Sequence, residues 1–398
     1  MGGRDLRSIE FPVTAQPGAA DTPTPHDTPR SPAVTQSPSP IEQLFAEADR
    51  DAEAQRAAPK RKRRGLRNTL IVLGSLIALL GIGAGIVYAM IANSYNEIER
   101  VSIEQDPSLE RPAVTTPEPG KKAPINVLLL GSDSRETTDP TATAEDLKGF
   151  RSDTIMVAQI SPDRQNLTVM SIMRDNWVGI QGVGEAKINA AVAYGGLPLA
   201  VNTVENFIGA RIDHVALIDF ESFKGLTDAV GGVTVRNEVA FTNQNGGGSS
   251  FEAGDITLNG EQALGFVRER YAFADGDYQR ARNQQAYLKG LMQKVLSRET
   301  LGNVGRLTDT FQALKPYLIL DQKLDLPTAV SLGFDMRNLR SENITLFTSP
   351  TLGTGTSADG QSIVVPDQAA LEEVRAAFQA GTINEYAAAR PPGSEVPQ

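Results

Sequence analysis

Charged side chains stand at the ends of three short apolar runs between residues 125 and 175. The runs and their flanking charges are 125–130 with Asp133 and Arg135, 154–160 with Arg151 and Asp153, and 167–173 with Arg174 and Asp175. Each run has the character of a buried strand, and ligands bind beyond strand ends in open α/β sheets. One such charge alone is usually a solvated loop residue. Three clusters at successive strand ends favour a binding or catalytic site.

The residue types at these positions and further along the chain point to phosphate chemistry. Arginine stays charged and can bind two phosphate oxygens through parallel hydrogen bonds. The candidate cations are Arg174, Arg268, Arg270 and Arg280, with Lys187 as a less oriented one. Asp133 and Asp153 would repel phosphate directly, so we predict a divalent cation, Mg²⁺ or Mn²⁺, between carboxylate and phosphate. The alternative is that these aspartates form salt bridges with the arginines.

Composition excludes several classes of enzyme. The 398 residues contain no cysteine, so thiolate chemistry and cysteine metal sites are impossible. Only two histidines occur, His26 and His214, which disfavours a histidine-based hydrolytic triad or zinc site. The formal net charge of -10 argues against a nucleic-acid partner, because such a partner needs a basic face.

The N-terminal part of the chain predicts a membrane anchor. Residues 1–68 are rich in Pro, Ser, Thr, Ala and charge, which predicts a disordered tail that ends in a basic flank from Lys60 to Arg67. Residues 69–92 contain no charged residue and are numerous enough for a transmembrane helix. A signal peptide would lie nearer the N-terminus and have a shorter apolar run. The basic flank places the N-terminus in the cytoplasm and the rest of the chain outside the cell membrane.

The remainder of the chain predicts one extracytoplasmic α/β domain. We expect a proline-rich stalk at 93–124, the domain at 125–380 and a disordered tail at 381–398. Strands are expected at 125–130, 154–160, 167–173, 214–220, 233–236, 344–347 and 363–365, and helices at 187–193, 197–208, 222–230, 259–266, 278–297, 301–314, 327–339 and 367–378. This alternation predicts a single mixed sheet between two helical layers, an α/β/α domain.

An ordered series of motifs in this domain resembles the LytR-CpsA-Psr family. The motifs are NVLLLGSDSR from residue 126, RSDT from 151, SIMRD from 171, KINA from 187, DF at 219, GGV from 231, GEQAL from 260, VRER from 267 and GDYQR from 276, followed by Gln284 and Gln285. The resemblance covers residues 125–297, and the predicted anchor and its orientation fit it as well. One departure is Met173, which stands where the family usually has proline. Proline would fix the backbone before Arg174, so the aim of that arginine is left open.

The resemblance implies an extracytoplasmic phosphotransferase of Gram-positive bacteria, including actinobacteria. Such an enzyme moves a glycopolymer, for example teichoic acid or arabinogalactan, from a polyprenyl-diphosphate carrier onto peptidoglycan through a phosphodiester bond in cell wall assembly. Its implied partners are the lipid-linked polymer, peptidoglycan and the lipid bilayer. The family's older label as a transcriptional regulator gains no support from this sequence.

The implied substrate gives each candidate residue a role. The pyrophosphate would be bound by Arg151, Arg174, Lys187, Arg268, Arg270, Arg280 and Gln284, and the catalytic set would be Asp133, Asp153, Arg174 and Asp175. Asp175 is a candidate base for the acceptor hydroxyl, with a structural ion pair to Arg174 as the alternative. Arg268 and Arg270 would project to one side of an extended segment but diverge in a helix.

Two other functions stay open. One is a non-catalytic binder of wall polymer or lipid pyrophosphate, and the other is a polyprenyl-pyrophosphate hydrolase that uses water in place of the sugar. The pair Asp133 and Asp153 disfavours the binder, because anion binding needs no carboxylates. No residue in the sequence decides between water and sugar.

Overall fold

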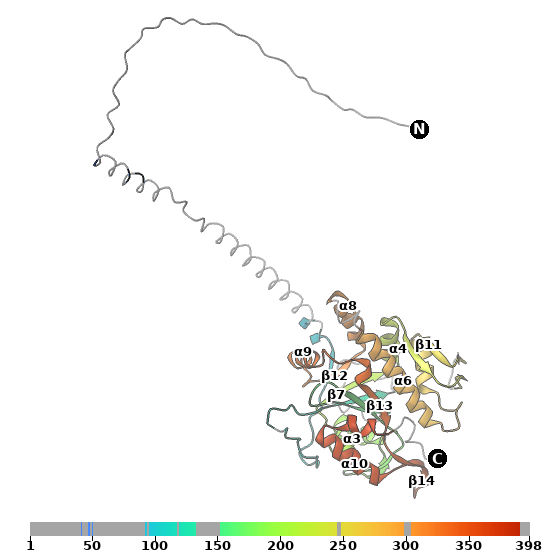
Figure 1. Cartoon of the computed structure of the whole chain (residues 1–398). Coiled ribbons are helices and arrows are strands. Elements are labelled where there is room, and N and C mark those ends of the chain that lie inside the picture. Colours follow the sequence, from blue (N-terminus) through green and yellow to red (C-terminus); the bar gives the residue numbers. More distant parts are fainter. Residues whose placement is uncertain are drawn as a thin grey trace, which may run out of the picture. The chain divides into compact units, whose positions relative to one another are not determined.

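The computed structural model describes a folded region that Figure 1 shows with its helices and strands. The described residues are 41, 47, 50, 92, 93, 95–117, 119–132, 152–244, 248–297 and 304–390. The chain divides into two units, residues 1–77 and 78–398, and every sheet and helix named below belongs to the second.

A seven-stranded mixed sheet is the centre of this region. In spatial order its strands are β1 (Glu99–Val101), β12 (Ile319–Asp321), β7 (His214–Asp219), β2 (Ile125–Ser132), β3 (Ser152–Ile160), β4 (Leu167–Ile172) and β13 (Ile344–Thr348). The pairs β1–β12, β7–β2 and β4–β13 are parallel, and the other three pairs are antiparallel. Every residue of β4 is buried, as expected for a central strand that is covered on both faces.

Helices cover the two faces of the main sheet. One face carries α3 (Ala190–Ile208), α10 (Gln368–Ala380) and α11 (Ile383–Ala388), and the other carries α6 (Asp277–Val295) and α9 (Leu326–Asp335). Figure 1 shows α3 and α10 side by side. Val157 and Met170 belong to the first core, whereas Met156 and Val169 belong to the second. Because alternate strand residues point to opposite faces, β3 and β4 each contribute to both cores. The predicted mixed α/β fold is confirmed.

A smaller region follows β7 in the chain. Its elements are α4 (Phe220–Ala229), β8 (Val233–Asn237), β9 (Phe241–Thr242), β10 (Ser250–Phe251), β11 (Gly254–Leu258) and α5 (Gly260–Arg268). Its two antiparallel strand pairs, β8–β11 and β9–β10, surround an aromatic core that includes Phe241, Phe251 and Phe266. At the start of α5, Asn259 and Gln262 each accept a hydrogen bond from the backbone N–H of the other. This capping box confirms the helix start predicted at Asn259.

The remaining elements include a hairpin whose last residue is the first residue of a predicted helix. They are β5 (Trp177–Ile180), β6 (Gly184–Lys187), α8 (Val304–Leu314), the 3₁₀ helices η2 (Lys315–Tyr317) and η3 (Ser341–Asn343), β14 (Thr351–Thr356) and β15 (Ser362–Pro366). The helix predicted at 187–193 is wrong in its first turn, because Lys187 ends β6 and α3 begins at Ala190. Gly182 and Gly184 in the β5–β6 turn have φ of 78° and 106°, a region that favours glycine and allows this tight turn.

The segment predicted as a stalk packs against the domain instead. Strand β1 is an edge strand of the main sheet, and Ile103 is buried in the core beneath α3. Arg111 forms an ion pair with Glu205, whose side chain is fully buried. Proline-rich composition predicts an extended backbone, but it does not predict whether side chains along that backbone contact the domain. In this segment, Ile103 and Arg111 both contact it.

The C-terminal boundary also differs from the prediction. The tail was expected to begin at residue 381, but α11 continues the fold, with Ile383 and Ala387 buried. Gly381 ends α10 with φ of 73°, and this turn brings α11 back onto the core. Residues 391–398 lie outside the described residues.

Two further predictions fall on residues that the structure does not describe. One is the disordered tail at 1–68, of which only residues 41, 47 and 50 are described. The other is the membrane span at 69–92, of which only Ala92 is described. Within the described part of the chain, no helix has both the length and the apolar character that crossing a bilayer requires.

The contact between Arg111 and Glu205 gives a first prediction. Arg111→Ala would leave the buried Glu205 carboxylate without its cation, and breaking a buried pair from one side typically costs about 3 kcal/mol or more. We therefore expect a clear loss of unfolding free energy in urea denaturation. Arg236→Ala is the matched control, because the Arg236–Asp255 pair is highly exposed and such pairs contribute less than about 1 kcal/mol. Equal losses of unfolding free energy in both variants would mean that the Arg111–Glu205 pair does not attach the segment before residue 125 to the domain.

Candidate active site

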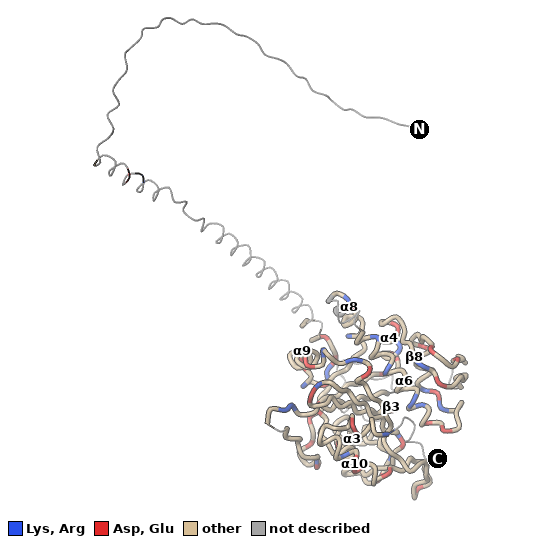
Figure 2. Tube along the Cα trace, viewed as in Figure 1, with Lys and Arg blue, Asp and Glu red and all other residues tan. Residues whose placement is uncertain are grey.

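A cavity of about 1380 Å³ is lined by the main sheet, by α4, α5 and α6, and by the hairpins β5–β6 and β14–β15. All predicted site residues that the structure describes line this one cavity: Asp153, Arg174, Asp175, Lys187, Arg268, Arg270, Arg280 and Gln284. Figure 2 shows acidic and basic positions interspersed over the described domain, without a single-sign face in that view.

The first group of charges comes from the ends of β3, β4 and β6. Arg174 forms an ion pair with Asp153 at the start of β3, and its Nε lies 3.8 Å from Oδ2 of Asp175. Lys187 Nζ lies 3.2 Å from Oδ1 of Asp175. The Nε of Arg174 is buried and donates no hydrogen bond to any described group. The Arg174 side chain as a whole is 19% exposed, so other parts of its guanidinium remain accessible to a ligand.

The turn after β4 fixes the position of Arg174. Met173 is buried against Tyr278, and its carbonyl accepts hydrogen bonds from the backbone N–H and the side-chain amide of Asn176 at 3.0 and 2.9 Å. Asn176 is fully buried, and the carbonyl of Arg174 accepts from the N–H of Asn189 at 3.2 Å. Burial and hydrogen bonding therefore hold this turn where the family usually has proline.

The second group of charges centres on Asp277, in the first turn of α6. Its carboxylate lies 3.1 Å from Nη2 of Arg280 and 3.6 Å from Nη1 of Arg270. Burial lowers the pKa of Arg280, with nearby Asp277 acting in the opposite direction. The hydrogen bond to the Tyr271 hydroxyl, 2.7 Å long, and the nearby Asp277 raise the pKa of Arg270. Both guanidinium groups stay charged at neutral pH.

Arg268 and Arg270 reach the same cavity from the end of α5. Arg268 is the last residue of the helix, and its guanidinium carbon lies 4.3 Å from the centre of the Phe220 ring. Glu269 between them is fully buried, and its carboxylate accepts from the backbone N–H groups of residues 270, 271 and 272 at 2.6 to 3.0 Å. The chain thus leaves the helix at Glu269, which lets both arginines line one cavity although they are only two residues apart.

The amides of α6 differ in where they point. Gln284 lines the cavity, and its Nε2 donates to the carbonyl of Val267 at 3.3 Å, next to the arginine-bearing turn. Gln285 instead donates to hydroxyls of Ser171 and Thr348 on two strands of the main sheet, at 3.0 and 3.1 Å. Gln284 is therefore the residue of the pair that can meet a ligand.

Two predicted residues cannot be placed, because Asp133 and Arg151 lie outside the described residues. Among the residues that are described, no group of three or more His, Asp or Glu side chains could hold a metal ion. Asp153 is in an ion pair with Arg174, as the salt-bridge alternative expected. The metal role of Asp133 and Asp153 stays a prediction.

Sequence reasoning missed Asp277 and Glu269 as parts of the site. Asp277 stands three residues before Arg280, a spacing that places both on one helix face and could have indicated the pair. Its second contact, with Arg270, joins α6 to the end of α5 and has no signal in sequence spacing. Glu269 likewise has no signal in sequence spacing, since its burial depends on how α5 packs.

Two other acids line the cavity but bond elsewhere: Asp219 caps α4, and Asp275 pairs with Arg282.

Apolar side chains make up much of the remaining wall. They include Leu129, Met156, Phe223, Leu226, Leu264, Leu288, Leu291 and Leu318. Tyr287 joins them, and burial raises the pKa of its phenol to about 12, so it stays neutral there. The cavity therefore combines a cluster of cations, several of them paired with aspartates, with an apolar surface supplied by α4, α5, α6 and the sheet.

Comparison with known proteins places this chain in a family. The chain is 36% identical over 268 residues to polyisoprenyl-teichoic acid–peptidoglycan teichoic acid transferase TagU of Bacillus anthracis, which covers 67% of this chain and 82% of the relative. The corresponding TagU of Enterococcus faecalis is 32% identical over 308 residues, covering 77% and 92%.

Solved structures share the fold. The crystal structure of Bacillus subtilis TagV matches with a TM-score of 0.56 at 26% identity, over 66% of this chain and 98% of that one. The structure of TagT bound to LIIa-WTA matches with a TM-score of 0.53 at 26% identity, over 70% and 99%. The model of the LytR_cpsA_psr family matches residues 86–380. The chain belongs to the LytR_cpsA_psr family.

Proposed function

We propose that this chain moves a glycopolymer from a polyprenyl-diphosphate carrier onto peptidoglycan through a phosphodiester bond. The TagU relatives are named as transferases of this kind. The observation that carries the proposal is the cavity itself, in which five cations and an extended apolar wall lie together. A polyprenyl diphosphate has the matching parts, a doubly charged head and a hydrocarbon chain.

The arginines act on the charge that develops as the pyrophosphate breaks. An acceptor sugar oxygen attacks the phosphorus next to the polymer, the bridging P–O bond breaks, and polyprenyl phosphate leaves with the bonding electron pair. We assign the stabilisation of the leaving phosphate to Arg268, Arg270 and Arg280, because they line one cavity near the end of α5 and the start of α6. The partly exposed guanidinium of Arg174 supplies a further donor for a phosphate oxygen.

Asp175 is the proposed base that takes the proton of the acceptor hydroxyl. Its carboxylate lies in the cavity, 3.2 Å from Lys187 and 3.8 Å from Arg174. The ion pairs with these cations orient the carboxylate as a candidate proton acceptor. Gln284 is proposed to orient a phosphate or sugar oxygen.

The donor set is compatible with Mg²⁺ or Mn²⁺, which we propose as the cofactor. Mg²⁺ usually binds proteins through one or two carboxylates and takes its other ligands from water and substrate phosphates. Asp153 lines the cavity with 22% of its side chain exposed, and Asp133 would be the second carboxylate. When bound, the ion would neutralise charge on the pyrophosphate oxygens.

A purified-protein assay tests the transfer. The full chain is supplied with lipid-linked donor, peptidoglycan acceptor and Mg²⁺, and both products are followed. We expect polyprenyl phosphate and polymer-linked peptidoglycan to form together. Polyprenyl phosphate without linked polymer would identify a hydrolase, and no product at all would identify a binder.

We also propose that residues 69–92 span the cell membrane with the N-terminus in the cytoplasm and the domain outside. The span is uncharged and follows a basic flank. Protease added to protoplasts should therefore digest the domain and spare an N-terminal fragment, as detected with an N-terminal epitope tag. Protection of the domain in intact protoplasts, with digestion after lysis, would refute this orientation.

A further inference from the structure

The outward face of α9 is apolar although it is exposed. Leu326, Ala329 and Leu332 pack into the cores beneath the helix. In the same helix, Val330 is 51% exposed and Phe334, four residues later, is 65% exposed. Residues four apart lie on one helix face, so these two side chains form an exposed apolar patch, with the Arg337 guanidinium over the Phe334 ring.

The predicted membrane span ends beside this helix. Ala92, the last residue of the uncharged run, contacts the same core cluster as Leu326 and Ala329 of α9. Tyr95 is three residues further on, so it lies within roughly 11 Å of Ala92 even if the chain is fully extended. The end of the span therefore cannot lie far from α9.

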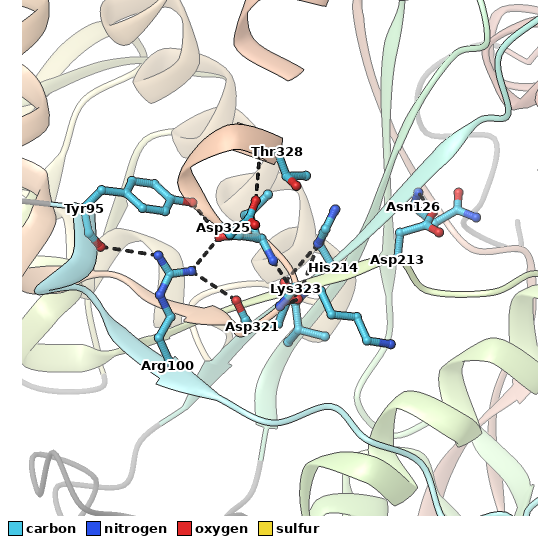
Figure 3. Close-up of polar contacts among 11 residues, drawn as sticks. Tyr95, Arg100, Asn126, Asp213, His214, Asp321, Lys323, Asp325 and Thr328 are labelled. Atoms are coloured by element: carbon cyan, nitrogen blue, oxygen red, sulfur yellow. Dashed lines mark hydrogen bonds and ion pairs between the residues drawn. The ribbon is translucent and has the colours of Figure 1, made fainter. Parts of the chain in front are cut away.

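Figure 3 shows how firmly the chain after the span is attached at this place. The Tyr95 hydroxyl donates to the carbonyl of Leu324 at 2.7 Å, and Arg100 Nη1 donates to the carbonyls of Asp321 and Leu324 at 3.1 and 2.6 Å. Strand β1 then pairs with β12 in the main sheet. Leu324 directly precedes Asp325, the N-cap of α9. Side-chain and strand contacts together fix α9 next to the point where the chain leaves the bilayer.

Basic side chains near both ends of α9 suit a lipid surface, and the acidic Asp335 next to Phe334 is paired with Lys122 and Arg164. Arg337 follows the helix, and its guanidinium carbon lies 4.2 Å from the centre of the Phe334 ring. Lys323 is exposed just before the other end of α9. Long basic side chains beside an aromatic ring are typical of the membrane interface, where the ring enters the headgroup layer and the cations meet phosphates.

We propose that the Val330 and Phe334 face of α9 docks on the outer surface of the lipid bilayer. This inference rests on the membrane span proposed above and adds a second contact, which would set the orientation of the domain on the membrane. A hinge at Ala92 alone would let the cavity face any direction. With both contacts, the domain presents one side to the membrane that holds the lipid-linked donor.

Because the chain has no cysteine, single-cysteine variants of the full protein can report on this face. Val330→Cys, Phe334→Cys and the control Val239→Cys are labelled with an environment-sensitive fluorophore and reconstituted into phosphatidylcholine–phosphatidylglycerol vesicles. The exposed fraction of Val239, 49%, is close to that of Val330, 51%. Val239 lies between β8 and β9 in the smaller region. Emission is then quenched either by nitroxide lipids or by aqueous iodide.

We expect labels at 330 and 334 to emit at shorter wavelength and to be quenched by the lipid nitroxide, and the label at 239 to be quenched by iodide. Adding Phe334→Glu to Val330→Cys should return the label to water. The docking is refuted if all three labels respond alike, or if those at 330 and 334 are shielded from both quenchers, which would indicate a protein partner or a second copy.

Flotation of the vesicles separates this inference from its basis. A chain that floats while its 330 and 334 labels are in water keeps its anchor and loses only the docking. A chain that does not float refutes the span and the docking together. Transfer activity, measured on the unlabelled chain, stands or falls independently of either result.

Discussion

Arg268→Ala and Arg270→Ala should each lower turnover by roughly tenfold to a hundredfold, because one charge-assisted phosphate contact is worth about 1.5 to 3 kcal/mol. Both side chains line the cavity, from the last residue of α5 and from the turn that Glu269 holds. The charge to be stabilised grows as the pyrophosphate breaks, so the loss should be larger in turnover than in donor binding.

The measurement is turnover and donor affinity for each variant, with release of polyprenyl phosphate as the signal. Arg236→Ala serves as the control, since its guanidinium is 73% exposed on the small β8–β11 sheet. It should leave both quantities unchanged. A loss of affinity with no loss of turnover in the two active-site variants would place these arginines in ground-state binding alone.

Asp153→Asn should weaken the response of the reaction to Mg²⁺ while leaving the fold nearly intact. The substitution keeps the size of the side chain and removes the charge that a hard cation requires. Asp153 is 22% exposed at a strand end, so little burial energy is at stake. We expect the Mg²⁺ concentration for half-maximal rate to rise strongly and the maximal rate to fall.

The ion pair with Arg174 is the competing role for Asp153, and the same variant tells the two apart. If Asp153 served only to hold Arg174, turnover would drop but the Mg²⁺ dependence of the remaining rate would match that of the unmodified protein. Asp255→Asn is the matched control, because its carboxylate is 69% exposed and pairs with Arg236. That control should change neither quantity.

The sequence predicted the parts of the fold whose patterns are long and apolar. Strands β2, β3 and β4 and helix α6 have apolar runs or stripes that burial alone explains. Strands β1 and β12 were missed, since each has three residues and exists because a neighbouring strand is in reach. The attachment of the segment before residue 125 was also missed, because it depends on contacts with residues that are distant in sequence.

The sequence likewise predicted some residues of the candidate site and not others. The cations and Asp153 could be identified from residue type, position and family motifs, and the structure brings those that it describes to one cavity. Asp277 and Glu269 could not, because what matters about them is that α5 and α6 meet at Arg270. Contacts between elements distant in sequence have no local pattern that predicts them.

The fate of the two phosphorus atoms tests the proposed phosphoryl transfer most directly. A lipid-linked donor labelled at the phosphorus next to the polymer is given to the full chain with peptidoglycan and Mg²⁺. We expect the label to appear in peptidoglycan in equal amount to the polyprenyl monophosphate released. Release of polyprenyl diphosphate, with the label on the lipid, would show that the sugar bond breaks instead and would contradict phosphoryl transfer.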